Sequence, residues 1–241
     1  MMEKIKKIKP FLQAQLFILK RKAYEFFGNE KFSKPYYGHD ELLKYIDKKN
    51  GFFIVGGGND GYFQDPTYYL ERFRGWTGII IEPTRIKKYC RVNRPQSVIF
   101  DVALVSHDFS GTNLTLVDCN TMTIVKDGVA GYQDWVSAGE QAQKIIAHEI
   151  TVLALTLDAL LAKYFARYPK RQIDLVTLDL EGYELEALKG LDLQKYQPEF
   201  LLIEIHRPER KEAIDSYLGN RYRLVTVIEA TDYLYQKNTH V

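Results

Sequence analysis

The sequence is poor in cysteine and has no long apolar run, and both absences narrow the class of protein. Its two cysteines, Cys90 and Cys119, form no CxxC motif and have no histidine nearby at metal-ligand spacing. This pattern fits a reduced, cytosolic protein better than a disulfide framework. No apolar run reaches the ~18–20 residues that a membrane-spanning helix needs. Residues 11–19 are followed by Lys-Arg-Lys instead of a small-residue cleavage site. They make a poor signal peptide, and we expect a cytoplasmic protein.

A large excess of charge of either sign is also missing. The 241 residues carry a formal net charge of +2, which gives no reason to expect a nucleic-acid partner. The length suits one well-buried α/β domain with a small appendage. Positive charge is nevertheless concentrated near the start of the chain. Within residues 1–22 a single acid, Glu3, stands against Lys4, Lys6, Lys7, Lys9, Lys20, Arg21 and Lys22.

Residues 1–30 have a helical pattern, because apolar side chains recur at spacings of three or four, at Ile5, Ile8, Leu12, Leu16 and Leu19. We favour a helix that packs on the domain and keeps its lysines in solvent. The alternative is an amphipathic helix within residues 1–25 that rests weakly on an anionic membrane, at its inner face.

From about residue 50 onward strands and helices alternate, which predicts a mostly parallel sheet with helices on both faces. We expect strands at 52–56, 78–82, 97–103, 173–179, 200–205, 222–228 and 232–236, and helices near 66–73, 84–91, 156–165, 183–189 and 208–218. The gap between the last two strands is too short for a helical crossover, so they should form an antiparallel hairpin at the sheet edge. The predicted fold is a Rossmann-like three-layer α/β sandwich with seven strands. We divide the chain into a helical extension, 1–45, and an α/β domain, 46–241.

Residues 105–150 show the weakest pattern. Short β-like pieces at 114–117 and 122–125 precede three glycines around Trp135. We expect an insertion that serves as a lid or an acceptor-binding loop, as long irregular segments often do.

The most informative segment is the turn after the first predicted strand. Gly56, Gly58 and Gly61 satisfy G-x-G-x-x-G, and the next strand ends at Glu82-Pro83. Glycines in such a turn let a ligand approach the backbone, and a carboxylate at the second strand end can accept both ribose hydroxyls. Asn59 and Asp60 within the turn disfavour a pyrophosphate and suit a ligand with an ammonium group. The segment therefore favours S-adenosylmethionine over NAD.

Three further strand ends carry polar residues. Asp101 lies near the end of the third predicted strand, where it would be close to adenine if Glu82 holds the ribose, although a solvated aspartate is an equal alternative. Asp179 ends the fourth predicted strand and Glu181 follows it, in a position where open α/β sheets bind ligands. Glu204 and His206 share one side of the fifth strand, and the histidine could deprotonate a hydroxyl. The alternative is that Glu204 and His206 only bond to each other and have no catalytic role.

Together these segments resemble the FkbM-type methyltransferases, a branch of the class I S-adenosylmethionine-dependent enzymes. The resemblance runs through residues 53–61, 69–71, 75–83, 103–106, 155–161, 179–184, 188–190 and 204–206. It implies O-methyl transfer to a hydroxyl, often on a sugar or secondary metabolite, and a seven-stranded sheet with a reversed final strand. The family usually has an acid where this chain has Val55, which leaves Asp60 or Asp179 to orient the methionine end of the cofactor.

We therefore predict a cytoplasmic methyltransferase with a small-molecule or glycan acceptor. The predicted cofactor residues are Gly56, Gly58, Asn59, Asp60, Gly61, Glu82, Pro83, Asp101 and Asp179, and the predicted catalytic residues are His206, Asp179 and Glu181. Carboxylates at 179, 181 and 204 could also bind a divalent metal, and a homo-oligomer is compatible with the sequence. Two alternatives stay open: an NAD-dependent oxidoreductase that acts on a sugar nucleotide, and a degenerate, membrane- or partner-binding module.

Overall fold

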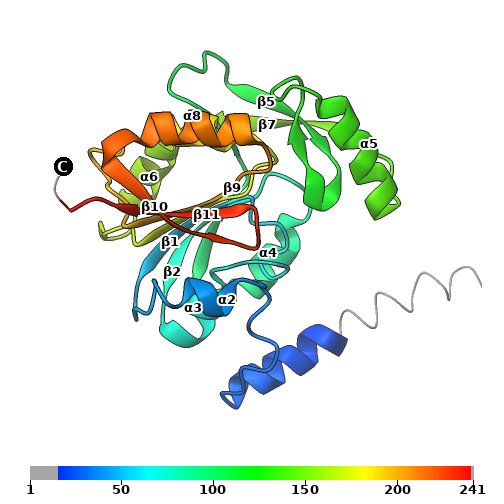
Figure 1. Cartoon of the computed structure of the whole chain (residues 1–241). Coiled ribbons are helices and arrows are strands. Elements are labelled where there is room, and N and C mark those ends of the chain that lie inside the picture. The colour runs from blue at the N-terminus through cyan, green and yellow to red at the C-terminus, as the bar shows by residue number, and fades with distance from the viewer. Residues whose placement is uncertain (1–15, 240–241) are drawn as a thin grey trace, which may run out of the picture.

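The computed structural model describes residues 16–239, and its centre is a seven-stranded sheet in the order β10-β11-β9-β8-β1-β2-β3 (Figure 1). Its strands are β1 (Phe52–Gly56), β2 (Thr77–Ile81), β3 (Ser97–Phe100), β8 (Leu175–Leu178), β9 (Phe200–Glu204), β10 (Tyr222–Ile228) and β11 (Asp232–Lys237). The strands β3, β2, β1, β8 and β9 pair in parallel, whereas β11 runs antiparallel to both β9 and β10. The predicted fold class and the reversed final strand are confirmed.

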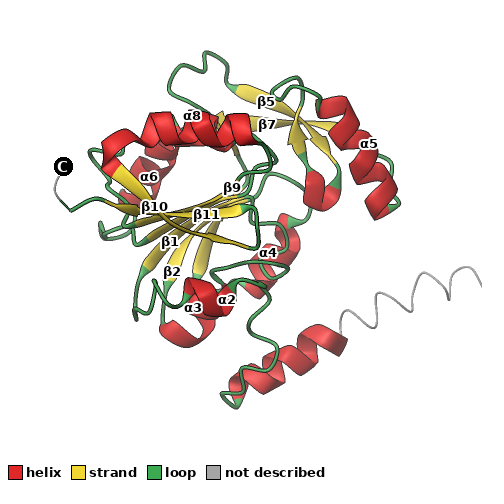
Figure 2. Cartoon of the chain, viewed as in Figure 1, coloured by secondary structure: helices red, strands yellow, loops and turns green. Residues whose placement is uncertain are grey.

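Helices cover both faces of this sheet (Figure 2). They are α2 (His39–Leu42), α3 (Tyr68–Arg74), α4 (Lys87–Asn93), α6 (Leu157–Phe165), α7 (Glu184–Leu188) and α8 (Pro208–Leu218), with a short 3-10 turn η2 (Gly219–Arg221). A further helix spans residues 16–26. The helix α6 begins where the Thr156 hydroxyl oxygen accepts a hydrogen bond from the Ala159 N–H over 3.1 Å, which satisfies a donor that the first turn leaves free.

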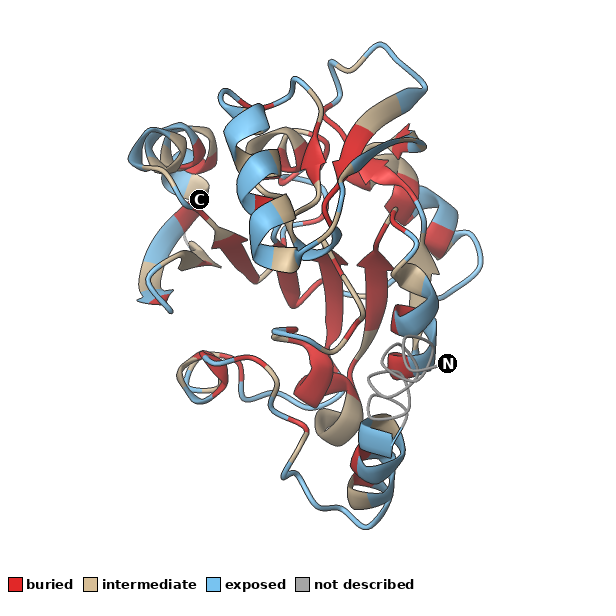
Figure 3. Ribbon diagram, turned by 90° about the vertical axis from the view of Figure 1, so that its right-hand side faces the viewer, coloured by how far each residue is buried: buried red, intermediate tan, exposed pale blue. Residues whose placement is uncertain are grey.

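The strand β1 explains why the molecule has two cores. Its side chains point alternately to the two faces of the sheet, and all five residues are buried. Phe52 and Ile54 pack with apolar residues of α6, α7 and α8, whereas Phe53 and Val55 pack with residues of α2, α3 and α4. The central strands β1, β2, β8 and β9 are accordingly almost continuously buried (Figure 3).

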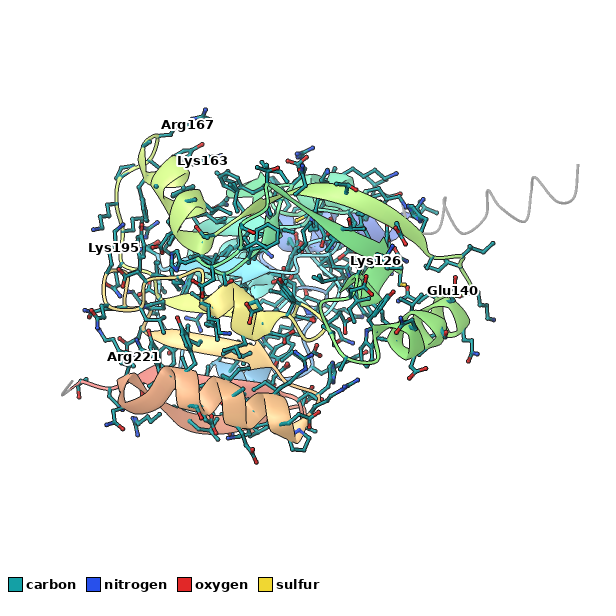
Figure 4. All side chains as sticks on the ribbon, turned by 90° about the horizontal axis from the view of Figure 1, so that it is seen from above. Lys126, Glu140, Lys163, Arg167, Lys195 and Arg221 are labelled. Atoms are coloured by element: carbon teal, nitrogen blue, oxygen red, sulfur yellow. The ribbon has the colours of Figure 1, made fainter. Side chains whose placement is uncertain are left out.

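Residues 103–155 form a second, four-stranded sheet in the order β4-β7-β5-β6. Its elements are β4 (Ala103–Leu104), β5 (Asn113–Asp118), η1 (Asn120–Met122), β6 (Ile124–Val125), α5 (Tyr132–Gln143) and β7 (His148–Leu155). The labelled side chains Lys126 and Glu140 lie on this part of the molecule, at the opposite end from Lys163 and Arg167 (Figure 4). The segment predicted to be an irregular insertion is therefore an ordered layer with its own apolar cluster around Cys119 and Ile124.

Two predictions along the chain need correction here. The predicted strand 97–103 is two strands: β3 ends at Phe100, and β4 pairs with β7 in the second sheet. The strand β7 was not predicted, although residues 150–155 form a largely apolar run; much of the strand is exposed. The expected helix over residues 1–30 lies outside the described residues up to residue 15, and the boundary at residue 45 stays a prediction. Among the residues that the structure describes, no helix is long and apolar enough to cross a membrane.

Candidate active site

A cavity of about 420 Å³ opens at the carboxyl ends of β1, β2, β8 and β9, between the two sheets. Its volume lies in the range of small-molecule and cofactor sites. Eight of the predicted cofactor and catalytic residues line this cavity, namely Gly56, Gly58, Asn59, Glu82, Pro83, Asp179, Glu181 and His206, and Glu204 lines it as well. The topology thus gathers strand ends that are more than 20 residues apart in the sequence, as open α/β sheets do at the carboxyl edge.

The glycine turn after β1 is held tightly against its neighbours. The N–H groups of Gly57 and Gly58 donate to the Ile81 carbonyl over 3.1 and 3.0 Å. Gly57 has a φ of +85°, and a Cβ on it would stand 1.9 Å from the carbonyl oxygen of Asp179. Both facts require glycine. Because these glycines have no side chains, their backbone atoms form the cavity wall beside Asp179.

Glu82 connects this turn to the segment after β2 through hydrogen bonds. One carboxylate oxygen accepts the Asn59 N–H over 2.8 Å, and the other accepts the N–H and hydroxyl of Thr84 over 2.8 and 2.6 Å. Burial raises the pKa of Glu82, although these hydrogen bonds favour its charged form. The side chain is 6% exposed yet lines the cavity, so lone pairs of a buried carboxylate face the ligand space.

Three predicted cofactor residues do not line the cavity: Asp60, Gly61 and Asp101. The Asp60 carboxylate accepts the N–H groups of Tyr62 and Phe63, so it holds its own turn. Gly61 has a φ of +74°, and a Cβ there would meet Cys90 on α4. Asp101 pairs with Lys87 over 3.0 Å, and its side chain is 54% exposed. Hydrogen bonding to Lys87 lowers the pKa of Asp101. Their cofactor roles stay predictions, and the structure gives each a local role as well.

Beside the glycine turn, the ends of β8 and β9 bring together Asp179, Glu181 and Glu204. Asp179 lies at the cavity wall with its side chain accessible, and desolvation by the surrounding walls together with the charges of Glu204 and Glu181 raises its pKa well above the ordinary range. Burial also raises the pKa of Glu181, to about 8. Like charges packed in a confined space favour protonation of some of the group. The raised pKa values thus favour the protonated forms of Asp179 and Glu181, and a cation bound in the cavity would favour their charged forms.

His206 stands next to this acidic cluster. Its Nε2 lies 3.0 Å from a carboxylate oxygen of Glu204, and this hydrogen bond raises the pKa of the imidazole against the effect of burial. Burial alone would raise the pKa of Glu204, but hydrogen bonds from His206 and Asp179 lower it. Glu204 is therefore the ionised member of the cluster, and it leaves the Nδ1 atom of His206 free for a ligand.

Two buried polar atoms at this end of the cavity make no well-formed hydrogen bond: the indole nitrogen of Trp135 and the Oε2 atom of Glu181. The indole nevertheless lies near enough to the Glu181 carboxyl group to favour its charged form. Trp135 comes from α5 of the second sheet layer, and its ring centroid lies 5.3 Å from that of His206. No local sequence pattern selects Trp135 beyond its place between glycines. At the other end of the cavity, the side-chain oxygen of Asn59 is likewise buried and unpartnered. Such groups are costly unless a ligand satisfies them.

Other lining residues were also missed at the sequence level. Tyr36 donates to Asp232 over 2.6 Å across a separation of 196 residues, and burial raises the pKa of Asp232 to about 6. Asn120 and Thr121 of η1 form another part of the wall. No local pattern marks these residues, because only the packing of distant segments places them beside the site.

A divalent cation has one candidate group of ligands among residues 16–239. Glu181, Glu204 and His206 each offer an atom, and these atoms lie within 4.8 Å of one another. Carboxylate and imidazole are suitable donors. However, two of these three candidate ligands, His206 and Glu204, already bond to each other. The arrangement alone therefore gives no support to the predicted metal.

The strand order with its antiparallel β11, the glycine turn and the carboxylate at the end of β2 define a class I S-adenosylmethionine-dependent methyltransferase fold and site. The unpartnered Asn59 oxygen and the carboxylate of Glu82 are acceptors that suit the hydroxyl and ammonium donors of that cofactor. The chain belongs to the FkbM methyltransferase family: residues 56–235 match the methyltransferase FkbM domain. It is an S-adenosylmethionine-dependent methyltransferase, and the oxidoreductase alternative is set aside.

Solved structures with similar folds are distant in sequence. A human methyltransferase 10 domain containing protein is 9% identical, with a TM-score of 0.45 over 85% of this chain and 83% of that chain. An S-adenosylmethionine-dependent methyltransferase from Aquifex aeolicus is 10% identical, with a TM-score of 0.40 over 89% and 96%. The delta-N METTL16 methyltransferase domain is 10% identical, with a TM-score of 0.40 over 83% and 78%. No curated protein sequence matches the chain. The family assignment rests on the domain match.

Proposed function

We propose that this methyltransferase transfers the methyl group to a hydroxyl of a sugar, glycan or other polyhydroxylated small molecule. The observation that carries the proposal is the polar end of the cavity. There the Glu204–His206 pair lies beside the buried indole N–H of Trp135 and the buried carboxyl of Glu181, two neighbouring groups that make no well-formed hydrogen bond. A donor and an acceptor together suit hydroxyl groups, which offer both functions.

At the cofactor end, Glu82 would hold the ribose hydroxyls, Gly56 and Gly58 would line the approach of the methionine and ribose, and Pro83 would lie beside the ribose. Asn59 offers its unpartnered oxygen to a donor of the cofactor. Val55 is apolar and buried where the family usually has an acid. We assign the ammonium group to Asp179 instead, because its backbone adjoins the turn and the residue lines the cavity.

The cofactor supplies a methyl group already activated on a sulfonium, so the protein has two tasks: to align the acceptor and to accept its proton. His206 is the base we propose. Its Nε2 is bonded to Glu204, so Nδ1 takes the hydroxyl proton while Glu204 stabilises the imidazolium that results. Burial raises the pKa of Glu181 to about 8, which suits this group to orient the acceptor through a hydrogen bond, whereas Asp179 in its charged form holds the ammonium group. Asp179 as base is the alternative assignment.

Trp135 supports a sugar as the acceptor. Its ring lies at the cavity wall, tilted 45° to the ring of His206. An apolar ring face flanked by carboxyl groups matches the alternation of C–H and O–H groups on a sugar. The cytoplasmic location, the lack of a nucleic-acid partner and a homo-oligomeric state stay predictions of the sequence.

The test uses S-adenosylmethionine with a ¹³C-labelled methyl group and acceptor panels of sugars, nucleotide sugars, phenols and amines. We expect an O-methyl carbon resonance in a product from the hydroxyl panel, and none with His206→Asn. Label recovered on nitrogen from the amine panel would contradict hydroxyl methylation. Turnover of phenols with no turnover of sugars would contradict the sugar class alone. Calorimetric binding of S-adenosylhomocysteine by the same preparations controls for an intact cofactor site.

A further inference from the structure

The helix over residues 16–26 presents most of its apolar side chains to solvent and buries two charged ones, Arg21 and Glu25, against the protein. Leu16 and Leu19 are each 64% exposed, and Phe26 and Phe27 just beyond are 84% and 81% exposed. Arg21 and Glu25 are 1% and 8% exposed. A helix that packs on a soluble domain normally has the reverse arrangement. The exposed apolar face therefore suggests that it contacts another apolar surface.

Polar contacts fix the helix in this orientation. The Arg21 guanidinium donates to the Asn93 side chain over 2.6 Å and lies over the ring of Tyr62, 4.1 Å from its centroid. Glu25 accepts hydrogen bonds from Tyr68 over 2.7 Å and from Arg72 over 3.1 Å. These partners belong to α3, α4 and the loop between β1 and α3. These hydrogen bonds therefore keep the opposite, apolar face of the helix turned toward solvent.

The exposed apolar residues form one continuous stripe. At about 100° per residue, Leu16, Leu19, Ala23, Phe26 and Phe27 fall within an arc of about 100°. The Phe27 N–H donates to the Ala23 carbonyl over 3.3 Å, so Phe27 continues the helical path. We call these five residues the outer stripe. By the same geometry Lys20 and Lys22, both exposed, flank it on its two sides.

We propose that the outer stripe binds the surface of an anionic lipid membrane, with the helix parallel to the surface. Apolar side chains that include two aromatic rings would enter the boundary between headgroups and acyl chains, while the flanking lysines reach the negatively charged headgroups. The charge pattern disfavours a second copy of the chain as the occupant, because pairing two outer stripes would bring their flanking lysines together.

The sequence upstream extends the same pattern. Ile5, Ile8 and Leu12 continue the spacing of the outer stripe among Lys4, Lys6, Lys7 and Lys9; these residues lie outside the described part of the chain. In Figure 1 the helix lies at the opposite end of the molecule from the second sheet. Membrane contact at the outer stripe leaves the cavity and its cofactor residues out of the interface, so this proposal does not depend on the acceptor.

Co-sedimentation of the full chain with vesicles tests the proposal. We compare phosphatidylcholine alone with phosphatidylcholine mixed with phosphatidylglycerol, at low and high salt. We expect binding to the mixed vesicles only, weakened by salt. The double variant Phe26→Ser/Phe27→Ser should lose at least about tenfold in vesicle affinity. Lys20→Glu/Lys22→Glu should lose at least about tenfold on the mixed vesicles.

Ile146→Ser is the matched control, because Ile146 is 87% exposed and lies in the second sheet layer. It should bind vesicles like the wild type. All variants should keep the wild-type melting temperature and affinity for S-adenosylhomocysteine. Equal vesicle binding by Phe26→Ser/Phe27→Ser and wild type would overturn the proposal. A wild-type dimer in sedimentation velocity that this variant converts to monomer, with no vesicle binding by either, would identify a second copy as the occupant and also overturn it.

Discussion

The backbone N–H of Asn59 donates a 2.8 Å hydrogen bond to the carboxylate of Glu82, across a separation of 23 residues. This bond ties the glycine turn after β1 to the end of β2. Asn59 adopts a φ of 46°, which non-glycine residues rarely do. The carboxylate therefore shapes the turn as well as facing the cavity, and its two roles can be separated by substitution.

Glu82→Gln should weaken S-adenosylhomocysteine binding by about tenfold or more, because hydrogen bonds to a charged group contribute about 1.5–3 kcal/mol each. The amide keeps the size of the side chain and one acceptor oxygen, so the melting temperature should fall less than with Glu82→Ala. Titration calorimetry measures the affinity.

Asp101→Asn is the matched comparison for Glu82→Gln, because both carboxylates are predicted to contact the adenosine. Asp101 is largely exposed and paired with Lys87, so we expect at most a small loss of affinity. A loss with Asp101→Asn as large as that with Glu82→Gln would show that the exposed carboxylate reaches the cofactor when it is bound.

Methyl transfer should increase with pH through an inflection above the ordinary pKa of histidine. His206 acts as a base only when neutral, and its hydrogen bond to Glu204 raises its pKa. Glu204→Gln should move the inflection to lower pH and lower kcat, because the neutral amide stabilises the imidazolium less. Profiles of kcat against pH for the two proteins provide the measurement.

His206→Asn should lower kcat by about 10²–10⁴-fold, the usual contribution of a general base, with unchanged binding of S-adenosylhomocysteine. An unshifted pH profile in Glu204→Gln would assign the inflection to another group, of which Asp179 is the nearest candidate. A corresponding loss with Asp179→Asn and a normal rate with His206→Asn would transfer the role of base to the aspartate.

The acidic cluster should make the ligand-free protein less stable as pH rises. Burial and neighbouring charge raise the pKa of Glu181 from 4.5 to about 8 and that of Asp232 to about 6. Between about pH 4.5 and 8 the folded protein thus binds more protons than the unfolded chain, so the free energy of unfolding falls with increasing pH. The raised pKa of His206 acts in the same direction, since its stabilising contribution is lost as pH rises through that pKa.

Glu181→Gln mimics the protonated form and should therefore raise the melting temperature at pH 8 by about 4 °C or more, with little change near pH 4.5. Thermal unfolding across this pH range tests it. Glu212→Gln on the exposed face of α8 is the control and should leave the melting temperature unchanged. A lower melting temperature for Glu181→Gln at pH 8 would show that its charge stabilises the fold.

Arg94→Met should destabilise the protein by about 3–5 kcal/mol, because it leaves buried carboxylates without their partner. The guanidinium pairs with Asp65, donates to Glu71 over 2.9 Å and reaches the Thr67 hydroxyl over 2.7 Å. Urea unfolding measures the change. Arg91→Met, at an exposed position of the same helix, is the control. A loss below about 1 kcal/mol for Arg94→Met would be typical of a solvated pair.

Chelation of divalent ions by EDTA should leave the methyl-transfer rate unchanged. The imidazole of His206 already provides Glu204 with a hydrogen-bonded partner, and we assign deprotonation to that pair. Loss of activity in EDTA that Mg²⁺ restores would instead make Glu181, Glu204 and His206 metal ligands. Calorimetric titration of Mg²⁺ into Glu181→Gln would then show weakened ion binding.

Local sequence determined the main sheet and the cofactor end of the site. An apolar strand followed by glycines, and a strand ending at Glu82, are short-range patterns that fix turn geometry and burial without reference to the rest of the chain. The same holds for the C-terminal hairpin, whose strands are only a few residues apart. These elements were predictable because the residues that cause each structure are neighbours in sequence.

Only the tertiary structure decided the polar end of the cavity and the outer face of the N-terminal helix. Trp135 reaches the cavity because the segment after β4 forms a sheet, and Tyr36 meets Asp232 because α2 packs beneath β11. The orientation of residues 16–26 depends on Arg21 and Glu25 finding partners on α3 and α4. The spacing of apolar residues in a sequence predicts an apolar helix face, but it does not say whether that face packs on the protein or faces solvent. Burial assigns that direction, and burial depends on contacts between residues that are far apart in the chain.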